Sequence, residues 1–60
     1  MINPTERDIG RWVSYLAYGG MIEDGVITRL DDQYVFVRYG ADSHSKATRR
    51  EDLSWYVLWE

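Results

Sequence analysis

The single histidine of the chain, His44, is the residue with the clearest capacity for chemistry. It stands between Ser43 and Ser45, so these residue types would support a serine nucleophile with a histidine base. A polar loop does not hold such a pair in a fixed geometry. Asp42 and His44 also supply only two ligands, where a structural metal site needs about four. We therefore predict a solvated loop histidine, with no nucleophilic site and no metal site.

Three pairs of adjacent acidic residues raise the question of carboxylate chemistry: Glu23-Asp24, Asp31-Asp32 and Glu51-Asp52. Hydrolysis by two carboxyl groups requires them to lie about 5 to 9.5 Å apart across a substrate cleft. Neighbouring strand residues instead point to opposite faces. Turn chemistry and helix-start charge explain the second and third pairs. Gly19-Gly20 lacks the spacing of a phosphate-binding loop. We predict that the protein is not an enzyme and binds no cofactor.

Arginine side chains accompany aromatic rings on the predicted third strand and its neighbour. Such interleaving is how proteins grip single-stranded nucleic acid, through base stacking and phosphate contact. The chain has seven basic and ten acidic residues, a formal net charge of −3, whereas nucleic-acid modules usually carry a basic footprint. Solvating cations paired with nearby carboxylates are the favoured interpretation. The alternative is nucleic-acid binding through Arg29, Arg38, Arg49 and Arg50.

The run from Trp55 to Trp59 is the most apolar segment of the chain. Its rings either close the core or form an exposed patch, and Trp and Tyr are frequent anchors of protein interfaces. The residues alone do not decide between these two interpretations. The candidate partner-binding residues are Tyr18, Tyr34, Phe36, Tyr56 and Trp59.

The length of the chain, 60 residues, predicts a single domain over residues 1–60 with a small core. The absence of cysteine indicates a reducing compartment. No apolar stretch approaches the roughly 20 residues of a membrane-spanning helix, and residues 1–8 do not have the pattern of a signal peptide. We expect a soluble, cytoplasmic protein that does not bind membranes.

Short runs of β-branched and aromatic residues between turn signals predict strands. We expect helical turns at 5–8 and near 48–53, the second capped by Thr48. Pairing of Leu30 with Val35 would place Thr28 opposite Val37. The predicted strands are 11–16, 25–30, 34–39, 46–48 and 54–59.

That register predicts which side chains are buried, because a one-residue slip inverts the faces of a strand. The predicted core consists of Val13, Val26, Leu30, Val35, Val37, Leu53 and Trp55. The opposite face of the second and third strands would carry Ile27, Arg29, Tyr34, Phe36 and Arg38. Gly25 is expected to mark a bulge or a close backbone approach.

The runs 8–15, 23–27, 34–40 and 47–53 resemble the strands and the helical turn of SH3-like barrels of the Tudor and KOW kind. Over residues 8–55 their order is similar to that in small uncharacterised proteins encoded by tailed phages and prophages. The resemblance implies an all-β, five-stranded SH3-like barrel with one or two short helical turns, and no catalytic residue. The candidates for a methyl-reading Tudor cage are Tyr15, Tyr18 and Tyr39, which the sequence does not place around one pocket.

Together these observations predict a non-enzymatic, phage-type accessory protein. Its expected role is to bind a protein or peptide partner through an aromatic surface, in the host cytoplasm if it is phage-encoded. Nucleic-acid binding is the alternative, and inhibition of a host factor is a third interpretation. Formation of a homodimer is compatible with all three.

Overall fold

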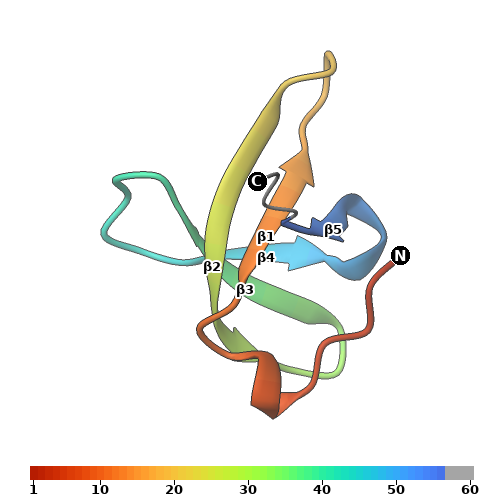
Figure 1. Cartoon of the computed structure of the whole chain (residues 1–60), viewed down its shortest axis with the longest axis vertical. Coiled ribbons are helices and arrows are strands. Elements are labelled where there is room, and N and C mark those ends of the chain that lie inside the picture. The colour runs from red at the N-terminus through yellow and green to blue at the C-terminus, as the bar shows by residue number, and fades with distance from the viewer. Residues whose placement is uncertain (57–60) are drawn as a thin grey trace, which may run out of the picture.

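The computed structural model describes residues 1–56 of the 60-residue chain, and Val57 to Glu60 lie outside the described residues. The chain is mostly β, as expected, with two short 3-10 turns, η1 at Glu6–Asp8 and η2 at Arg50–Asp52 (Figure 1). The strands are β1 (Trp12–Leu16), β2 (Ile22–Leu30), β3 (Tyr34–Tyr39), β4 (Lys46–Arg49) and β5 (Leu53–Trp55).

The five strands form one antiparallel sheet in the order β4-β3-β2-β1-β5. Among the described residues β4 and β5 do not pair with each other, so the hydrogen-bonded sheet is not closed into a barrel. No helix in this part of the chain has the length and apolar character needed to span a membrane. The last strand ends at Trp55, whereas the predicted strand was 54–59. Tyr56 is not in a strand, and residues 57–59 lie outside the described residues.

A β-bulge between β2 and β3 corrects the predicted register. Leu30 pairs with Val35 as expected, but the pairing shifts between Ile27 and Arg29, so that Ile27 lies opposite Val37. The extra residue, Thr28, has no partner in the ladder. A bulge inserts one residue and exchanges the faces of the strand beyond it.

The bulge changes which residues of β2 are buried. Ile27, predicted on the outer face, is completely buried, whereas Val26, predicted in the core, is only half-buried and points outward. Arg29 and Phe36, which were also predicted on the outer face, form the first pair after the shift.

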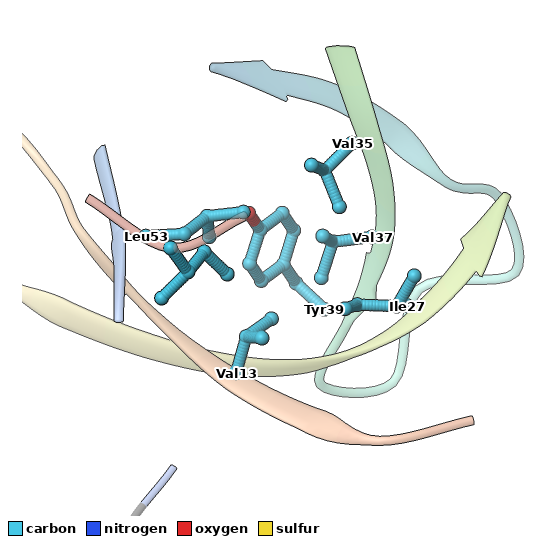
Figure 2. Close-up of a cluster of buried hydrophobic side chains, with 7 residues drawn as sticks. Val13, Ile27, Val35, Val37, Tyr39 and Leu53 are labelled. Atoms are coloured by element: carbon cyan, nitrogen blue, oxygen red, sulfur yellow. The ribbon is translucent and has the colours of Figure 1, made fainter. Parts of the chain in front are cut away.

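The core contains more aromatic surface than the sequence indicated. Val13, Val35, Val37 and Leu53 are buried as predicted, and Leu30 and Trp55 pack against them from partly buried positions. In Figure 2 the side chains of Val13, Val37 and Leu53 are directed toward the ring of Tyr39. The buried members of this hydrophobic cluster that were not predicted are Ile2, Ile27 and Tyr39.

Gly25 marks a close approach between β2 and β3, one of its two expected roles. A Cβ atom at this position would lie 2.6 Å from Cγ1 of Val37 and 2.7 Å from the carbonyl oxygen of Arg38. The absence of a side chain therefore lets β3 pack tightly where Tyr39 enters the core.

The two 3-10 turns occupy the predicted places, but one predicted cap is wrong. The amide of Thr5 donates to the Asp8 carboxylate (2.8 Å) at the start of η1. At η2 the position before the first residue is Arg49, not Thr48. Thr48 instead belongs to β4, where it is buried and its Oγ1 shares a 2.7 Å hydrogen bond with the Tyr39 hydroxyl.

Candidate functional site

The outer face of the β1–β2 hairpin carries a strip of paired side chains. Side chains alternate along a strand, so Trp12, Ser14 and Leu16 point away from the core that Val13 occupies. Directly opposite residues of an antiparallel pair share a face. We call this surface the hairpin strip; its pairs are Trp12 with Val26, Ser14 with Asp24, and Leu16 with Ile22.

Much of the hairpin strip is apolar and open to solvent. Trp12 is 53% exposed, Leu16 62% and Ile22 67%. At the tip of the hairpin, Tyr18 and Met21 are also exposed. Large side chains that are exposed next to one another are more informative than scattered ones, because contiguous apolar patches mark interaction surfaces.

The far half of the hairpin has no neighbouring strand. β5 pairs with β1 only from Val13 to Tyr15, and the pairing of β3 with β2 begins at Gly25. Figure 1 shows β1 and β2 rising together beyond the other strands. The pair Leu16 and Ile22 therefore lies on a two-stranded ribbon, with no third strand from residues 1–56 beside it.

An open hollow lies at the base of the hairpin strip, and we call it the Trp12 hollow. Its volume is about 500 Å³, and it is lined by Arg11, Trp12, Asp24 and Tyr56. The rings of Trp12 and Tyr56 are tilted by 51° with centroids 6.2 Å apart. The Tyr56 amide donates a hydrogen bond to the Trp12 carbonyl (3.2 Å), which holds the two residues together.

The two charged groups of the Trp12 hollow differ in their partners. The Arg11 guanidinium donates to the Asp8 carboxylate (2.9 Å) and stacks over the Trp55 ring at 4.0 Å. A hydrogen bond from the Thr5 amide, together with Arg11, lowers the pKa of Asp8. Asp24 accepts a hydrogen bond from the Ser14 hydroxyl (2.7 Å), and among the described residues it has no ion-pair partner within 4.0 Å.

The four predicted partner-binding residues that the structure describes lie at three places in the fold. Tyr18 is at the hairpin tip, and Tyr56 lines the Trp12 hollow. Tyr34 and Phe36 lie on β3, opposite Arg49 and Ala47 of β4. Trp59 lies outside the described residues.

Three residues of the hairpin strip, Trp12, Leu16 and Ile22, were not among the predicted site residues. Alternation along a strand of residues 11–16 places Trp12 and Leu16 on one face. The burial of Val13 on the other face identifies theirs as the outer face.

The four arginines of the predicted nucleic-acid surface fall into two groups. Arg38 is exposed and belongs to the row Trp12–Val26–Arg38 across three strands. The Arg29 guanidinium lies 4.0 Å from the centroid of the Phe36 ring.

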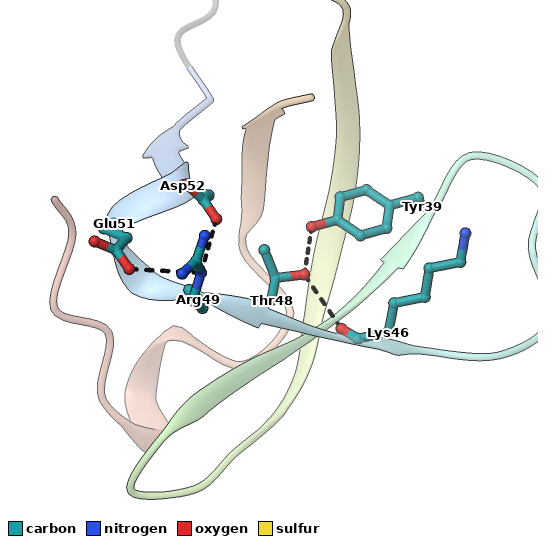
Figure 3. A network of polar contacts seen from close by, with 6 residues as sticks. All are labelled: Tyr39, Lys46, Thr48, Arg49, Glu51 and Asp52. Atoms are coloured by element: carbon teal, nitrogen blue, oxygen red, sulfur yellow. Dashed lines mark hydrogen bonds and ion pairs between the residues drawn. The ribbon is translucent and has the colours of Figure 1, made fainter. Parts of the chain in front are cut away.

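The other two arginines of this set make contacts within the chain. Arg49 forms ion pairs with Glu51 (3.5 Å) and Asp52 (3.3 Å), as Figure 3 shows. Arg50 donates to the carbonyl oxygens of Asp31 (2.8 Å) and Asp32 (3.5 Å). The guanidinium groups of Arg49 and Arg50 are therefore partly occupied by contacts within the chain around η2.

A second open hollow, of about 550 Å³, contains two of the three tyrosines considered for a cage. The Tyr15 and Tyr39 rings have centroids 5.7 Å apart, whereas Tyr18 is at the distant hairpin tip. The cationic side chains of Lys46 and Arg49 line the same hollow. The carboxylates of Glu23 and Asp52 line it as well, so the hollow carries charges of both signs.

The histidine loop between β3 and β4 has the open character that its sequence predicts. His44 is exposed, and it lines a shallow hollow of about 250 Å³ with Asp42, Ser43 and Lys46. Lys46 forms a 3.8 Å ion pair with Asp42. Within residues 1–56 no group of three or more His, Cys, Asp or Glu side chains is placed to hold a metal ion.

Comparison of the chain with protein-family models, with curated proteins and with solved structures finds no match.

Proposed function

We propose that this chain is a non-enzymatic binding module that recognises a protein or peptide partner through the hairpin strip. The observation that carries the proposal is the pair Leu16 and Ile22, which lie opposite each other, each more than half exposed, beyond the last support from β5 and β3. Exposed apolar side chains contribute little to the stability of the fold, and their burial by a partner makes the free energy of binding more favourable.

The proposed architecture is SH3-like. The strand order β4-β3-β2-β1-β5 and the 3-10 turn between β4 and β5 support it. A relation to phage-encoded proteins rests on the resemblance of residues 8–55 and stays a prediction.

The experiment that tests the proposed function compares capture by matched variants. The immobilised chain and the double variant Leu16→Ser/Ile22→Ser are exposed to a lysate of the native host cell, and bound proteins are quantified by mass spectrometry. We expect a partner whose recovery falls by about tenfold or more in the double variant, since two apolar anchors contribute about 1 kcal/mol or more each.

The control is Ile9→Ser, which removes a 47% exposed apolar side chain outside the hairpin strip. It should leave recovery of the partner unchanged. Circular dichroism checks that both variants are folded. Equal recovery by the chain and by the double variant would refute the proposed site.

Nucleic-acid binding is a second candidate, supported by the row that contains Arg38, Val26 and Trp12 and by the Arg29–Phe36 stack. Binding of this kind weakens steeply with added salt, because phosphate contacts release counterions. It is tested by fluorescence anisotropy of a labelled oligothymidine at two salt concentrations. Arg38→Ala should weaken binding, and binding that does not change with salt would remove this candidate.

A further inference from the structure

Asp24 holds the central position of the hairpin strip. It shares a row with Ser14, between the row of Trp12 and Val26 and the row of Leu16 and Ile22. Successive same-face rows are two residues apart, or about 7 Å along a strand. The strip therefore presents an apolar row, a carboxylate and a second apolar row at the spacing of alternate residues in an extended chain.

The carboxylate of Asp24 forms no ion pair within 4.0 Å among the described residues, although Arg38 belongs to the adjacent row of Trp12 and Val26. From Trp12 to Thr28 the sequence contains two acidic residues and no Lys, Arg or His. The other acidic residue, Glu23, pairs with Tyr15 and so points to the opposite face. Arg11 reaches the Trp12 hollow, but its guanidinium is occupied by Asp8 and by the Trp55 ring. The Ser14 hydroxyl orients the Asp24 carboxylate without neutralising it.

Aromatic rings flank this carboxylate in the Trp12 hollow. Trp12 and Tyr56 line the hollow together with Asp24. A cation is attracted to the face of a Trp or Tyr ring as well as to a carboxylate, and the long stem of Lys or Arg packs on apolar surface. The hollow thus matches a basic side chain better than a neutral polar one.

From this geometry we infer that the partner presents an extended segment of the pattern apolar–x–basic–x–apolar. Its Arg or Lys side chain enters the Trp12 hollow and pairs with Asp24. Its two apolar side chains cover the rows on either side of Asp24. This inference rests on the proposed function and specifies the chemistry of the partner.

The test uses a synthetic probe of that pattern, acetyl-Thr-Leu-Thr-Arg-Thr-Leu-Thr-amide, and a control peptide with Glu in place of Arg. Backbone amide shifts of the ¹⁵N-labelled chain are followed during titration up to about 5 mM peptide, where a complex with a Kd of about 1 mM is mostly formed. We expect the Arg peptide to shift the signals of Trp12, Asp24 and Tyr56, and the Glu peptide to bind at least threefold more weakly, about the effect of an exposed ion pair.

Two variants with the same change in net charge separate a specific pair from general attraction. Asp24→Asn retains a hydrogen-bond acceptor for Ser14 and should weaken binding of the Arg peptide by about threefold. Glu23→Gln removes the neighbouring charge on the opposite face and should leave binding unchanged. Equal effects of the two variants, or equal binding of the two peptides, would overturn the inference.

The remaining outcomes distinguish this inference from the proposed function. If both peptides bind equally and Leu16→Ser/Ile22→Ser abolishes both interactions, the strip is a binding surface and the predicted basic residue is wrong. If the Arg peptide causes no shift at the highest concentration, the inference is overturned, and the capture experiment decides the proposed function on its own.

Discussion

Substitutions at Ile27 and Val26 test the bulged register of β2 directly, because the two possible registers bury different residues. Ile27 is completely buried in the structure, whereas Val26 is half-buried on the outer face. Truncation of a buried Ile to Ala costs about 2 to 5 kcal/mol of unfolding free energy, through lost burial and the cavity that remains. The whole free energy of unfolding of a chain of this length is about 3 to 9 kcal/mol. Ile27→Ala should therefore remove most or all of the stability.

A milder substitution keeps the experiment interpretable if Ile27→Ala does not fold. Ile27→Val removes one buried methylene and should cost about 1 kcal/mol. Val26→Ala removes two partly solvated methyl groups and should cost less than about 1 kcal/mol. Urea unfolding followed by tryptophan fluorescence measures the free energy of unfolding for each variant. If Val26→Ala destabilises the chain more than Ile27→Ala does, the bulge at Thr28 is wrong and the regular register holds.

Three further predictions concern packing and pH. Gly25→Ala should destabilise the chain by about 1 to 3 kcal/mol in urea unfolding, because the new Cβ would lie 2.6 Å from Cγ1 of Val37; an unchanged midpoint would show that β3 can move away. Burial raises the pKa of Tyr39, so its contribution to stability is complete below the unfolded pKa of about 10 and is lost as pH rises above it; Tyr39→Phe should reduce that alkaline loss and leave Thr48 without its 2.7 Å partner. Two backbone amides of the β2–β3 turn lower the pKa of Asp31, so its contribution is present above the unfolded value of about 4 and is lost as pH falls below it; thermal unfolding of Asp31→Asn should depend less on pH in that acidic range.

The strands could be predicted from the sequence because their signals are local. The run Tyr34 to Tyr39 has high β propensity at each position and ends at a glycine, and it is a strand over that range. The pair Leu30 and Val35 was also predictable, since the short turn between them fixes it. Local chemistry of this kind is contained in a few consecutive residues.

The buried set of β2 was not predictable, because a bulge depends on both strands. Thr28 reads as an ordinary strand residue, yet its Oγ1 donates to the Phe36 carbonyl (3.2 Å) across the irregular step. Thr48 was similarly misleading, since the pattern of a helix cap and the pattern of a buried strand threonine coincide. The pairing of Thr48 with Val35 and its hydrogen bond with the Tyr39 hydroxyl distinguish them.

The sequence predicted a binding surface with aromatic residues, and of those residues Tyr18 and Tyr56 border the hairpin strip proposed as the site. Leu16 and Ile22 could not be identified, because their exposure results from where β3 and β5 stop pairing. That is a property of the whole sheet.

The short reach of β3 and β5 separates the proposed binding surface from the core of this small protein. Leu16 and Ile22 lie outside the core cluster, so replacing them changes the stability of the chain little. In a chain with so little stability to lose, residues that pack on the core cannot be replaced freely. The end of the hairpin is a place where side chains can be exchanged without loss of the fold.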